Sequence, residues 1–276
     1  MAMIEVSDEE LSSLVRAINL RYGMDFENYE PISFKRRVAR VIDRFKLDNS
    51  LGLWRKIMSE KDFIYTFIDE ITVGLTEMFR NPDFWIKMRE EYLPKYRSQS
   101  EIAIWHAGCS TGEEVYSMGI LMAEEYLTAK GRVWATDLNS QSVKNTEDGT
   151  FSTYYEKNYN TNYVASKGKK PSLDAYYTVE NELMKFSTKV RFNNIKFQQH
   201  NLVKDDVNQK FDIIFCRNVM IYFDEALKMR VLEKFYNALN DDGLFIIGYY
   251  DAMPNGYKKY FDNYDPQTKT YTKVKS

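Results

Sequence analysis

The most constraining feature of the sequence is a change of pattern after Pro94, from helical spacing to short apolar runs that alternate with helical stretches. Residues 102–105 form the first apolar run, a small-residue loop follows at 107–112, and residues 113–127 have helical spacing. Strands that alternate with helices in this way favour an open, mostly parallel sheet with helices on both faces. Further strands are expected at 132–136, 197–199, 211–216 and 244–247, with helices from near Asn139 and over 225–239, the last closed by Asp242-Gly243.

The chain before this sheet is predicted to be helical. Ser7 and Glu10 form a capping-box pattern ahead of apolar residues at helical spacing, and a strongly basic amphipathic helix follows at 32–45. Helices are also expected at 50–58 and 62–71, then a linker at 72–80, and then a helix from Asn81-Pro82 that ends at Pro94. We therefore expect a helical domain at 1–74, a linker with a first helix at 75–94, and the sheet domain at 95–276.

One segment interrupts the alternation. Residues 154–193 are rich in Asn, Lys, Ser and Tyr, and they end in short alternating runs at 184–186 and 189–192. This pattern predicts a helix and loop that lead into a small antiparallel β insert, near 160–195.

Composition excludes several functional classes. The net charge is −2, so the chain lacks the overall positive field that carries nucleic-acid binding. Two histidines and two scattered cysteines lack the short spacing of zinc ligands, so we expect no metal. The N-terminus does not resemble a signal peptide and no apolar stretch is long enough to span a bilayer, so we expect a cytoplasmic protein without direct membrane insertion. We also expect a monomer.

The loop at 107–112 is the first candidate ligand site, because open parallel sheets bind ligands at the carboxyl ends of their strands. Gly108 and Gly112 would allow close approach of a ligand, while Glu113 and Glu114 would repel a phosphate. Asp137 follows the next strand, where an acid can accept both ribose hydroxyls. A nucleoside without phosphate but with a positive sulfonium is S-adenosylmethionine. The alternatives are a tight structural turn and a helix-capping aspartate.

Five blocks, in this order, resemble the CheR family of receptor methyltransferases. They are Thr-Glu-Met-Phe-Arg at 76–80, Ala-Gly-Cys-Ser-Thr-Gly-Glu-Glu-Val-Tyr-Ser at 107–117, Ala-Thr-Asp at 135–137, Asn-Leu at 201–202, and Phe-Asp-Ile-Ile-Phe-Cys-Arg-Asn-Val-Met-Ile-Tyr-Phe at 211–223. The resemblance covers nearly the whole chain. It implies an α/β fold with a Rossmann-like class I methyltransferase sheet, a small N-terminal all-helical domain and a small antiparallel β insert.

The resemblance also implies a reaction and its residues. The expected activity is methylation of glutamate side chains on the cytoplasmic helices of chemotaxis receptors, with S-adenosyl-L-methionine as cofactor and S-adenosyl-L-homocysteine as product. Arg80 and Tyr222 are expected nearest the reacting methyl, where Arg80 would orient a carboxylate and Tyr222 would align the substrate. The residues expected around the cofactor are Thr76, Arg80, Glu114, Asp137, Asn201, Leu202, Arg217 and Asn218.

The basic helix is the candidate for substrate binding. Arg37, Arg40 and Arg44 fall at spacings of three and four, so they share one helical face that could meet acidic receptor helices. The alternative is an ordinary solvated face. Other residues have similar structural alternatives: Tyr222 could simply pack, and Arg217 could pair with Asp224 or Glu225.

The chain departs from the family pattern at two places. Gly74 stands where the family usually has an asparagine, and 249–251 read Tyr-Tyr-Asp instead of a short polar residue and a glutamate. A catalytically impaired scaffold or sensor of the same fold is therefore an alternative, although Arg80 and Tyr222 are retained. A nucleic-acid methyltransferase is disfavoured because 218–221 lack an Asn-Pro-Pro-Tyr motif, and a dehydrogenase because the glycine loop lacks G-x-G-x-x-G spacing.

Overall fold

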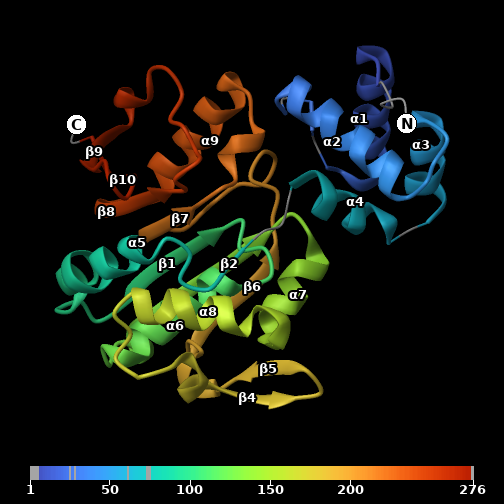
Figure 1. Cartoon of the computed structure of the whole chain (residues 1–276). Helices are drawn as coiled ribbons and strands as arrows, with labels where there is room; N and C mark the ends of the chain where they lie inside the picture. Colours follow the sequence, from blue (N-terminus) through green and yellow to red (C-terminus); the bar gives the residue numbers. More distant parts are fainter. Residues whose placement is uncertain (1–5, 25, 28, 61, 73–75, 275–276) are drawn as a thin grey trace.

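The computed structural model describes residues 6–24, 26–27, 29–60, 62–72 and 76–274 (Figure 1). The N-terminal part contains the helices α1 (Asp8–Tyr22), α2 (Pro31–Arg44), α3 (Ser50–Ser59) and α4 (Phe63–Thr72). The predicted capping box is present, since the Ser7 hydroxyl accepts the Glu10 N–H and the Glu10 carboxylate accepts the Ser7 N–H. The apolar faces of all four helices pack into one cluster.

The predicted mostly parallel sheet is confirmed. Its first five strands run parallel in the order β6 (Asn194–Gln199), β2 (Gly131–Asp137), β1 (Ile102–Ala107), β7 (Phe211–Cys216) and β8 (Leu239–Ile247). Two antiparallel strands that the sequence did not predict, β10 (Thr270–Lys273) and β9 (Phe261–Asp265), extend the β8 edge. The direction of strand addition reverses at β1, between β2 and β7.

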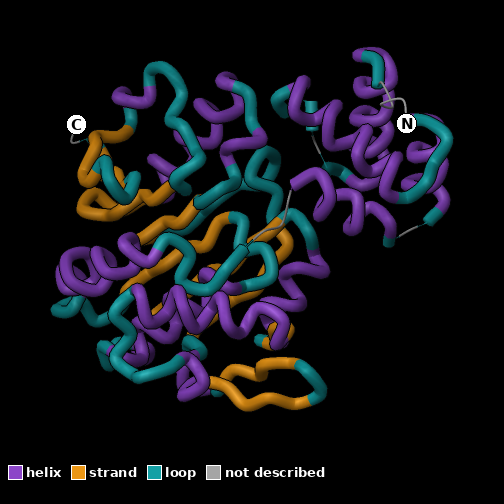
Figure 2. Tube along the Cα trace, viewed as in Figure 1, coloured by secondary structure: helices purple, strands orange, loops and turns teal. Residues whose placement is uncertain are grey.

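Helices cover both faces of the sheet (Figure 2). Alternate residues of β1 point to opposite sides, as in any strand. Ile102 and Ile104 pack with α5 (Pro82–Lys87), α6 (Glu113–Glu124) and α8 (Glu156–Ala165), whereas Ala103 and Trp105 pack with α9 (Glu225–Ala238). The helix α7 (Ser140–Asp148) lies against β2 and β6.

Two predicted helix ends were wrong. The segment that begins with α5 continues as a π-helix (Met88–Tyr92) and a 3-10 turn (Leu93–Tyr96), so Pro94 does not end it. A proline is accepted there because residues in a first helical turn need no N–H partner. The helix α9 ends at Ala238 and Leu239 is already extended, so Asp242-Gly243 lies inside β8.

The β insert is a three-stranded antiparallel sheet in the order β3 (Thr150–Ser152), β5 (Leu183–Phe186) and β4 (Tyr177–Glu180). The predicted strand at 184–186 corresponds to β5. The predicted strand at 189–192 was wrong, because Thr188–Val190 form a 3-10 turn. The alternation there arises because Val190 and Phe192 are buried in the core while Lys189 and Arg191 are not.

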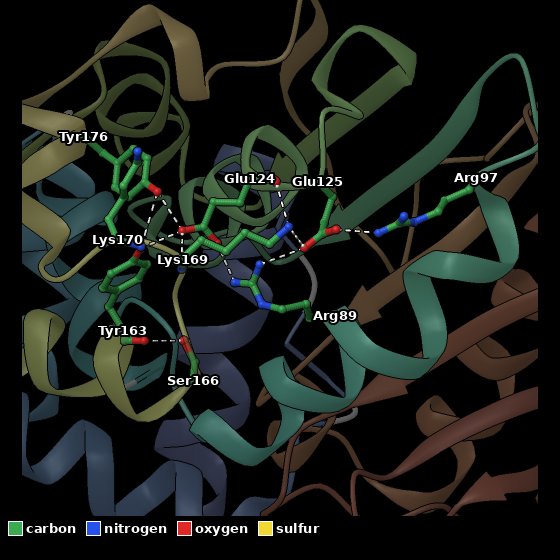
Figure 3. Close-up of polar contacts among 9 residues, drawn as sticks. All are labelled: Arg89, Arg97, Glu124, Glu125, Tyr163, Ser166, Lys169, Lys170 and Tyr176. Atoms are coloured by element: carbon green, nitrogen blue, oxygen red, sulfur yellow. Dashed lines mark hydrogen bonds and ion pairs between the residues drawn. The ribbon is translucent and has the colours of Figure 1, made fainter.

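A buried polar network attaches the insert to the sheet domain (Figure 3). The Glu124 carboxylate, at the end of α6, accepts hydrogen bonds at 2.6 Å from Tyr163 Oη, Tyr176 Oη and Arg89 Nη2. Its neighbour Glu125 pairs with Lys169 at 2.8 Å. Because Tyr163 and Tyr176 precede β4, this network fixes the approach of the chain to the insert.

The helical domain docks at the carboxyl ends of the sheet strands (Figure 1). Tyr29 forms a β-bridge with Phe223, and the Glu30 N–H donates to the Tyr222 carbonyl at 3.1 Å. A second contact joins Asn139 Nδ2 to Asp69 Oδ1 of α4 at 2.6 Å. Within the described residues, none of the helices is long and apolar enough to cross a membrane.

Candidate functional site

A cavity of about 300 Å³ lies where the helical domain meets the carboxyl ends of β1, β2, β6 and β7. This is the position at which open α/β sheets bind ligands, since the order of strands reverses there. Both parts of the chain contribute to the lining, so the cavity exists only when they are docked. Every predicted cofactor residue lines it: Thr76, Arg80, Glu114, Asp137, Asn201, Leu202, Arg217 and Asn218.

The glycine loop connects β1 to α6, contacts the end of β2 and lines the cavity through Gly108. Gly108 has a left-handed φ of 86°, and a Cβ at this position would lie 2.5 Å from Val219 Cγ2. Gly112 has φ 101° and would bring a Cβ to 2.7 Å from Thr146 Cγ2. The turn itself therefore requires both glycines. The G-x-x-x-G spacing is explained by a tight structural turn, and this explanation is compatible with a ligand-binding role for the same loop.

Asp137 closes β2 and faces the cavity. Its Oδ2 accepts the Ser110 N–H at 2.8 Å and its Oδ1 accepts the Asn139 N–H at 2.9 Å. Burial raises the pKa of Asp137, and these backbone hydrogen bonds oppose the rise. Each carboxylate oxygen keeps a further lone pair, so the side chain can organise the loop and accept ligand hydroxyls at once. Asn139, not Asp137, caps α7, since Asn139 Oδ1 accepts from Gln141 and Ser142.

The two loop glutamates have different surroundings. Glu114 lines the cavity, and its carboxylate binds His106 Nδ1 at 2.8 Å and Arg217 Nη1 at 3.2 Å. Burial raises the pKa of Glu114, but the hydrogen bond from His106 and the charge of Arg217 outweigh it and hold the pKa below its usual range. Glu113 instead faces the helix layer, where it accepts from Thr111 and Tyr159. Of the two carboxylates expected to repel a phosphate, only that of Glu114 lines the cavity.

Arg217 is tied to the cavity wall on several sides. Besides Glu114, it donates to the Arg80 carbonyl at 3.1 Å and to Asn81 Oδ1 at 2.8 Å, and it lies over the Phe84 ring. The proposed pairing with Asp224 or Glu225 was wrong, because Asp224 caps α9 and Glu225 pairs with Lys228. The buried Arg217 Nε has no partner among the described residues, which leaves one donor for a ligand carboxylate.

Tyr222 lies at the domain boundary. The Arg37 guanidinium carbon is 4.7 Å from the centre of the Tyr222 ring, and the Tyr29 ring stacks at 6.3 Å on the same side chain. Burial raises the pKa of Tyr222 against the influence of Arg37, so the phenol stays protonated at neutral pH. Arg80 lines the same cavity. The structure thus brings together Tyr222, Arg80 and Arg37.

The three predicted substrate-binding arginines do not share one surface. Arg37 is half-buried, lines the cavity and donates to the Ile71 carbonyl at 2.5 Å. Arg40 is exposed, and Arg44 pairs with Glu70 of α4. The exposed basic ridge of α2 is formed by Arg36, Arg40 and Arg44, at spacings of four, and Arg44 also pairs with Glu70. This face differs from the predicted one in one residue, because Arg36 is exposed there and Arg37 is not.

Sequence reasoning did not identify Asp69. It lines the cavity from α4, and its carboxylate holds Asn139. Burial raises the pKa of Asp69, the hydrogen bond from Asn139 opposes this, and the charge of Asp137 adds to the rise. Only the docking of α4 onto α7 reveals the residue, since in the sequence it is one acid in an amphipathic helix. Gly74 lies outside the residues that the structure describes.

The fold and the cavity define an α/β protein with a ligand site at the carboxyl ends of its strands and an added helical domain. Two family models match the chain: "CheR methyltransferase, SAM binding domain" over residues 74–270 and "CheR methyltransferase, all-alpha domain" over residues 9–72. The chain belongs to the CheR methyltransferase family, and its cofactor is S-adenosylmethionine.

Several curated relatives match over most of their length. A protein of Pseudomonas putida named "Putative methyltransferase Cher3" is 33% identical over 95% of each chain. Two proteins named chemotaxis protein methyltransferase are each 28% identical: that of Listeria monocytogenes covers 89% of this chain and 91% of its own length, and that of Borreliella burgdorferi covers 93% and 96%.

The lining fits the cofactor. Asp137 can accept the ribose hydroxyls, and the orphaned Arg217 Nε can donate to the carboxylate of the methionine portion. Asn201 and Leu202 follow β6 and line the same cavity. Among the described residues, no group of three or more His, Cys, Asp or Glu could hold a metal ion.

Proposed function

We propose that this chain methylates glutamate side chains on the cytoplasmic helices of chemotaxis receptors. The names of the Listeria and Borreliella relatives support a role in chemotaxis. The single structural observation that favours a carboxylate acceptor is the pair of arginines, Arg37 and Arg80, that line the cavity together with Tyr222. Guanidinium groups orient carboxylates through charge-assisted hydrogen bonds.

The reaction places few demands on acid–base chemistry. The bound cofactor supplies a methyl group on a positively charged sulfur. A glutamate carboxylate is already ionised near neutral pH, so no side chain has to remove a proton from it. In this proposal Arg80 orients the acceptor carboxylate and Tyr222, a neutral phenol, aligns it, so that catalysis comes mainly from positioning. Arg37 holds the Tyr222 ring from the helical domain.

The outer surface of α2 extends the proposal to the receptor. Arg36 and Arg40 project from the exposed face of the helix, and opposite charge on an acidic receptor helix would accelerate encounter. Residues 1–74 would then be the receptor-facing domain and 95–276 the cofactor domain, joined by 75–94. We place the reaction in the cytoplasm, where these receptor helices lie, and expect the protein to act as a monomer.

The test is transfer of tritiated methyl from S-adenosylmethionine to purified chemoreceptor cytoplasmic fragments. Methyl esters of carboxylates are hydrolysed by mild alkali, so the label should leave as volatile methanol. Fragments in which the candidate glutamates are replaced by alanine are the matched control and should take up no label. Alkali-stable label would point to a different acceptor atom. Calorimetric binding of S-adenosylhomocysteine without transfer to any receptor would favour the impaired scaffold instead.

A further inference from the structure

The segment that follows β7 carries much of the site. Arg217, Asn218 and Tyr222 all lie between the end of β7 and the start of α9. Its backbone is irregular, since Asn218 has a left-handed φ of 61° and Met220–Tyr222 form a short 3-10 turn. An irregular segment of this kind keeps one conformation only when its surroundings hold it. The groups that hold it therefore influence the site without lining it.

Asp251 is such a group. Its side chain is fully buried, and its carboxylate accepts three backbone N–H groups: those of Asn218 at 2.5 Å, Gly248 at 2.7 Å and Ile221 at 2.9 Å. Two of these donors belong to the segment after β7. Because both carboxylate oxygens are used, the side chain clamps the segment near Asn218 and again next to Tyr222.

The clamp is itself anchored to the end of β8. The Asp251 N–H donates to the Gly248 carbonyl at 3.0 Å, and Lys269 Nζ donates to the Asp251 carbonyl at 2.5 Å. Packing gives independent evidence of the close contact. A Cβ at Gly248 would lie 2.6 Å from the Asn218 backbone nitrogen and 2.7 Å from Asn218 Cγ. The glycine thus lets the segment rest directly on the strand end.

Asp251 does not line the cavity, whereas Asn218, Ile221 and Tyr222 do. We infer that Asp251 is a positioning residue for methyl transfer, which fixes the Asn218–Tyr222 backbone through hydrogen bonds to Asn218 and Ile221. This inference requires that the chain transfers methyl groups, but it does not depend on which acceptor is methylated. It also gives a role to the Tyr-Tyr-Asp sequence at 249–251, which departs from the family pattern.

The direct test compares Asp251→Asn with Asp212→Asn in the full chain. Asp212 is a matched control, because it is also buried and its carboxylate also accepts a backbone N–H, from Ala103 at 2.8 Å, and Asn240 Nδ2 at 2.8 Å. It lies at the opposite end of β7, far along the strand from the cavity. Both variants should unfold at a lower temperature. In each, one carboxylate oxygen that accepted a hydrogen bond is replaced by an NH2 group, so two donors face each other.

Three readouts separate positioning from stability. In Asp251→Asn, hydrogen–deuterium exchange should rise about tenfold in peptides covering 217–223, as expected for loss of about one hydrogen bond to a charged acceptor. The second readout is affinity for S-adenosylhomocysteine, measured by calorimetry well below the unfolding temperature, and the third is turnover. Turnover should fall more than affinity, because the hydrogen bond between Asp251 and the Ile221 N–H holds the part of the turn that carries Tyr222. Asp212→Asn should leave all three at the wild-type value.

The inference is overturned if Asp251→Asn loses only thermal stability, or if Asp212→Asn shows the same loss of turnover. Exchange and cofactor affinity need no acceptor, so they decide the matter even if no receptor is methylated by the wild-type protein. Should Asp251→Asn fail to fold, Gly248→Ala perturbs the same contact from the strand side and should give the same increase in exchange at 217–223. Unchanged exchange in that variant would equally refute the role.

Discussion

Replacement of Asp137 by asparagine tests the cofactor site most directly. Asp137 already accepts the N–H groups of Ser110 and Asn139, one on each oxygen. Hydrogen bonds to a charged acceptor contribute about 1.5–3 kcal/mol each, and asparagine retains one acceptor oxygen for the two ribose hydroxyls. The expected loss of binding free energy is therefore about 2–4 kcal/mol, or roughly 30- to 1000-fold in the dissociation constant of S-adenosylhomocysteine.

Calorimetry of S-adenosylhomocysteine binding measures this loss, with Asp212→Asn again as the control for general destabilisation. The dependence on pH adds a second criterion. Burial raises the pKa of Asp137, so acidification should protonate this carboxylate and weaken binding at a higher pH than for an ordinary aspartate. The asparagine variant should lack that acidic loss. A dissociation constant within about threefold of wild type would refute the assignment of Asp137 to the ribose, because it corresponds to less than about 1 kcal/mol.

Three further changes have distinct expected outcomes. Gly108→Ala should reduce cofactor affinity at least tenfold and lower the unfolding temperature, because its Cβ would collide with Val219 in the segment after β7. The control is Gly23→Ala, where φ is also positive but the space around the residue is open. This variant should lose only about 1–2 kcal/mol of stability and should keep its cofactor affinity. Arg40→Glu should slow receptor methylation several-fold, most at low ionic strength, with cofactor affinity unchanged; equal losses at high and low salt would contradict electrostatic steering. Burial lowers the pKa of His200, so the stability of the fold should decrease as the pH drops below about 6.5, where the unfolded chain takes up a proton. In thermal scans between pH 5 and 7, the unfolding temperature of His200→Gln should depend less on pH than that of the wild type. An equal dependence on pH in the two proteins would rule out His200 as the cause.

The regular part of the fold could be predicted because each buried strand of the sheet is a short apolar run between turn signals. The two strands beyond β8, β10 and β9, could not. Phe261–Asp265 carries only two apolar residues and is largely exposed, so it lacks the pattern of a buried strand. Lys189 and Arg191 alternate with buried neighbours as a strand would, yet the segment is a 3-10 turn. An alternation of polar and apolar residues over four positions shows which side chains are buried, but several backbone conformations can produce it.

The candidate site was predictable where it follows the strand ends and less so where it depends on domain docking. Glu114, Asp137 and Arg217 were identified from motifs attached to strands, and all line the cavity. Arg37 was predicted on an exposed face of α2 but lines the cavity instead, because helical spacing cannot show which neighbour covers a face. Asp69 was missed for the same reason. Both belong to the helical domain, and both acquire their positions from contacts with residues far along the chain.

The docking of the two domains determines the position of Tyr222 in the cavity. The helical domain contacts the segment after β7 through the backbone of Tyr29 and Glu30 and through Arg37 on the Tyr222 ring. The other side of that segment is held by Asp251. Tyr222 is therefore fixed from two directions, by a domain that presents a basic surface outward and by a strand end of the cofactor domain. Because Arg37 belongs to the helical domain, a change in how the two domains dock should change the position of the Tyr222 ring.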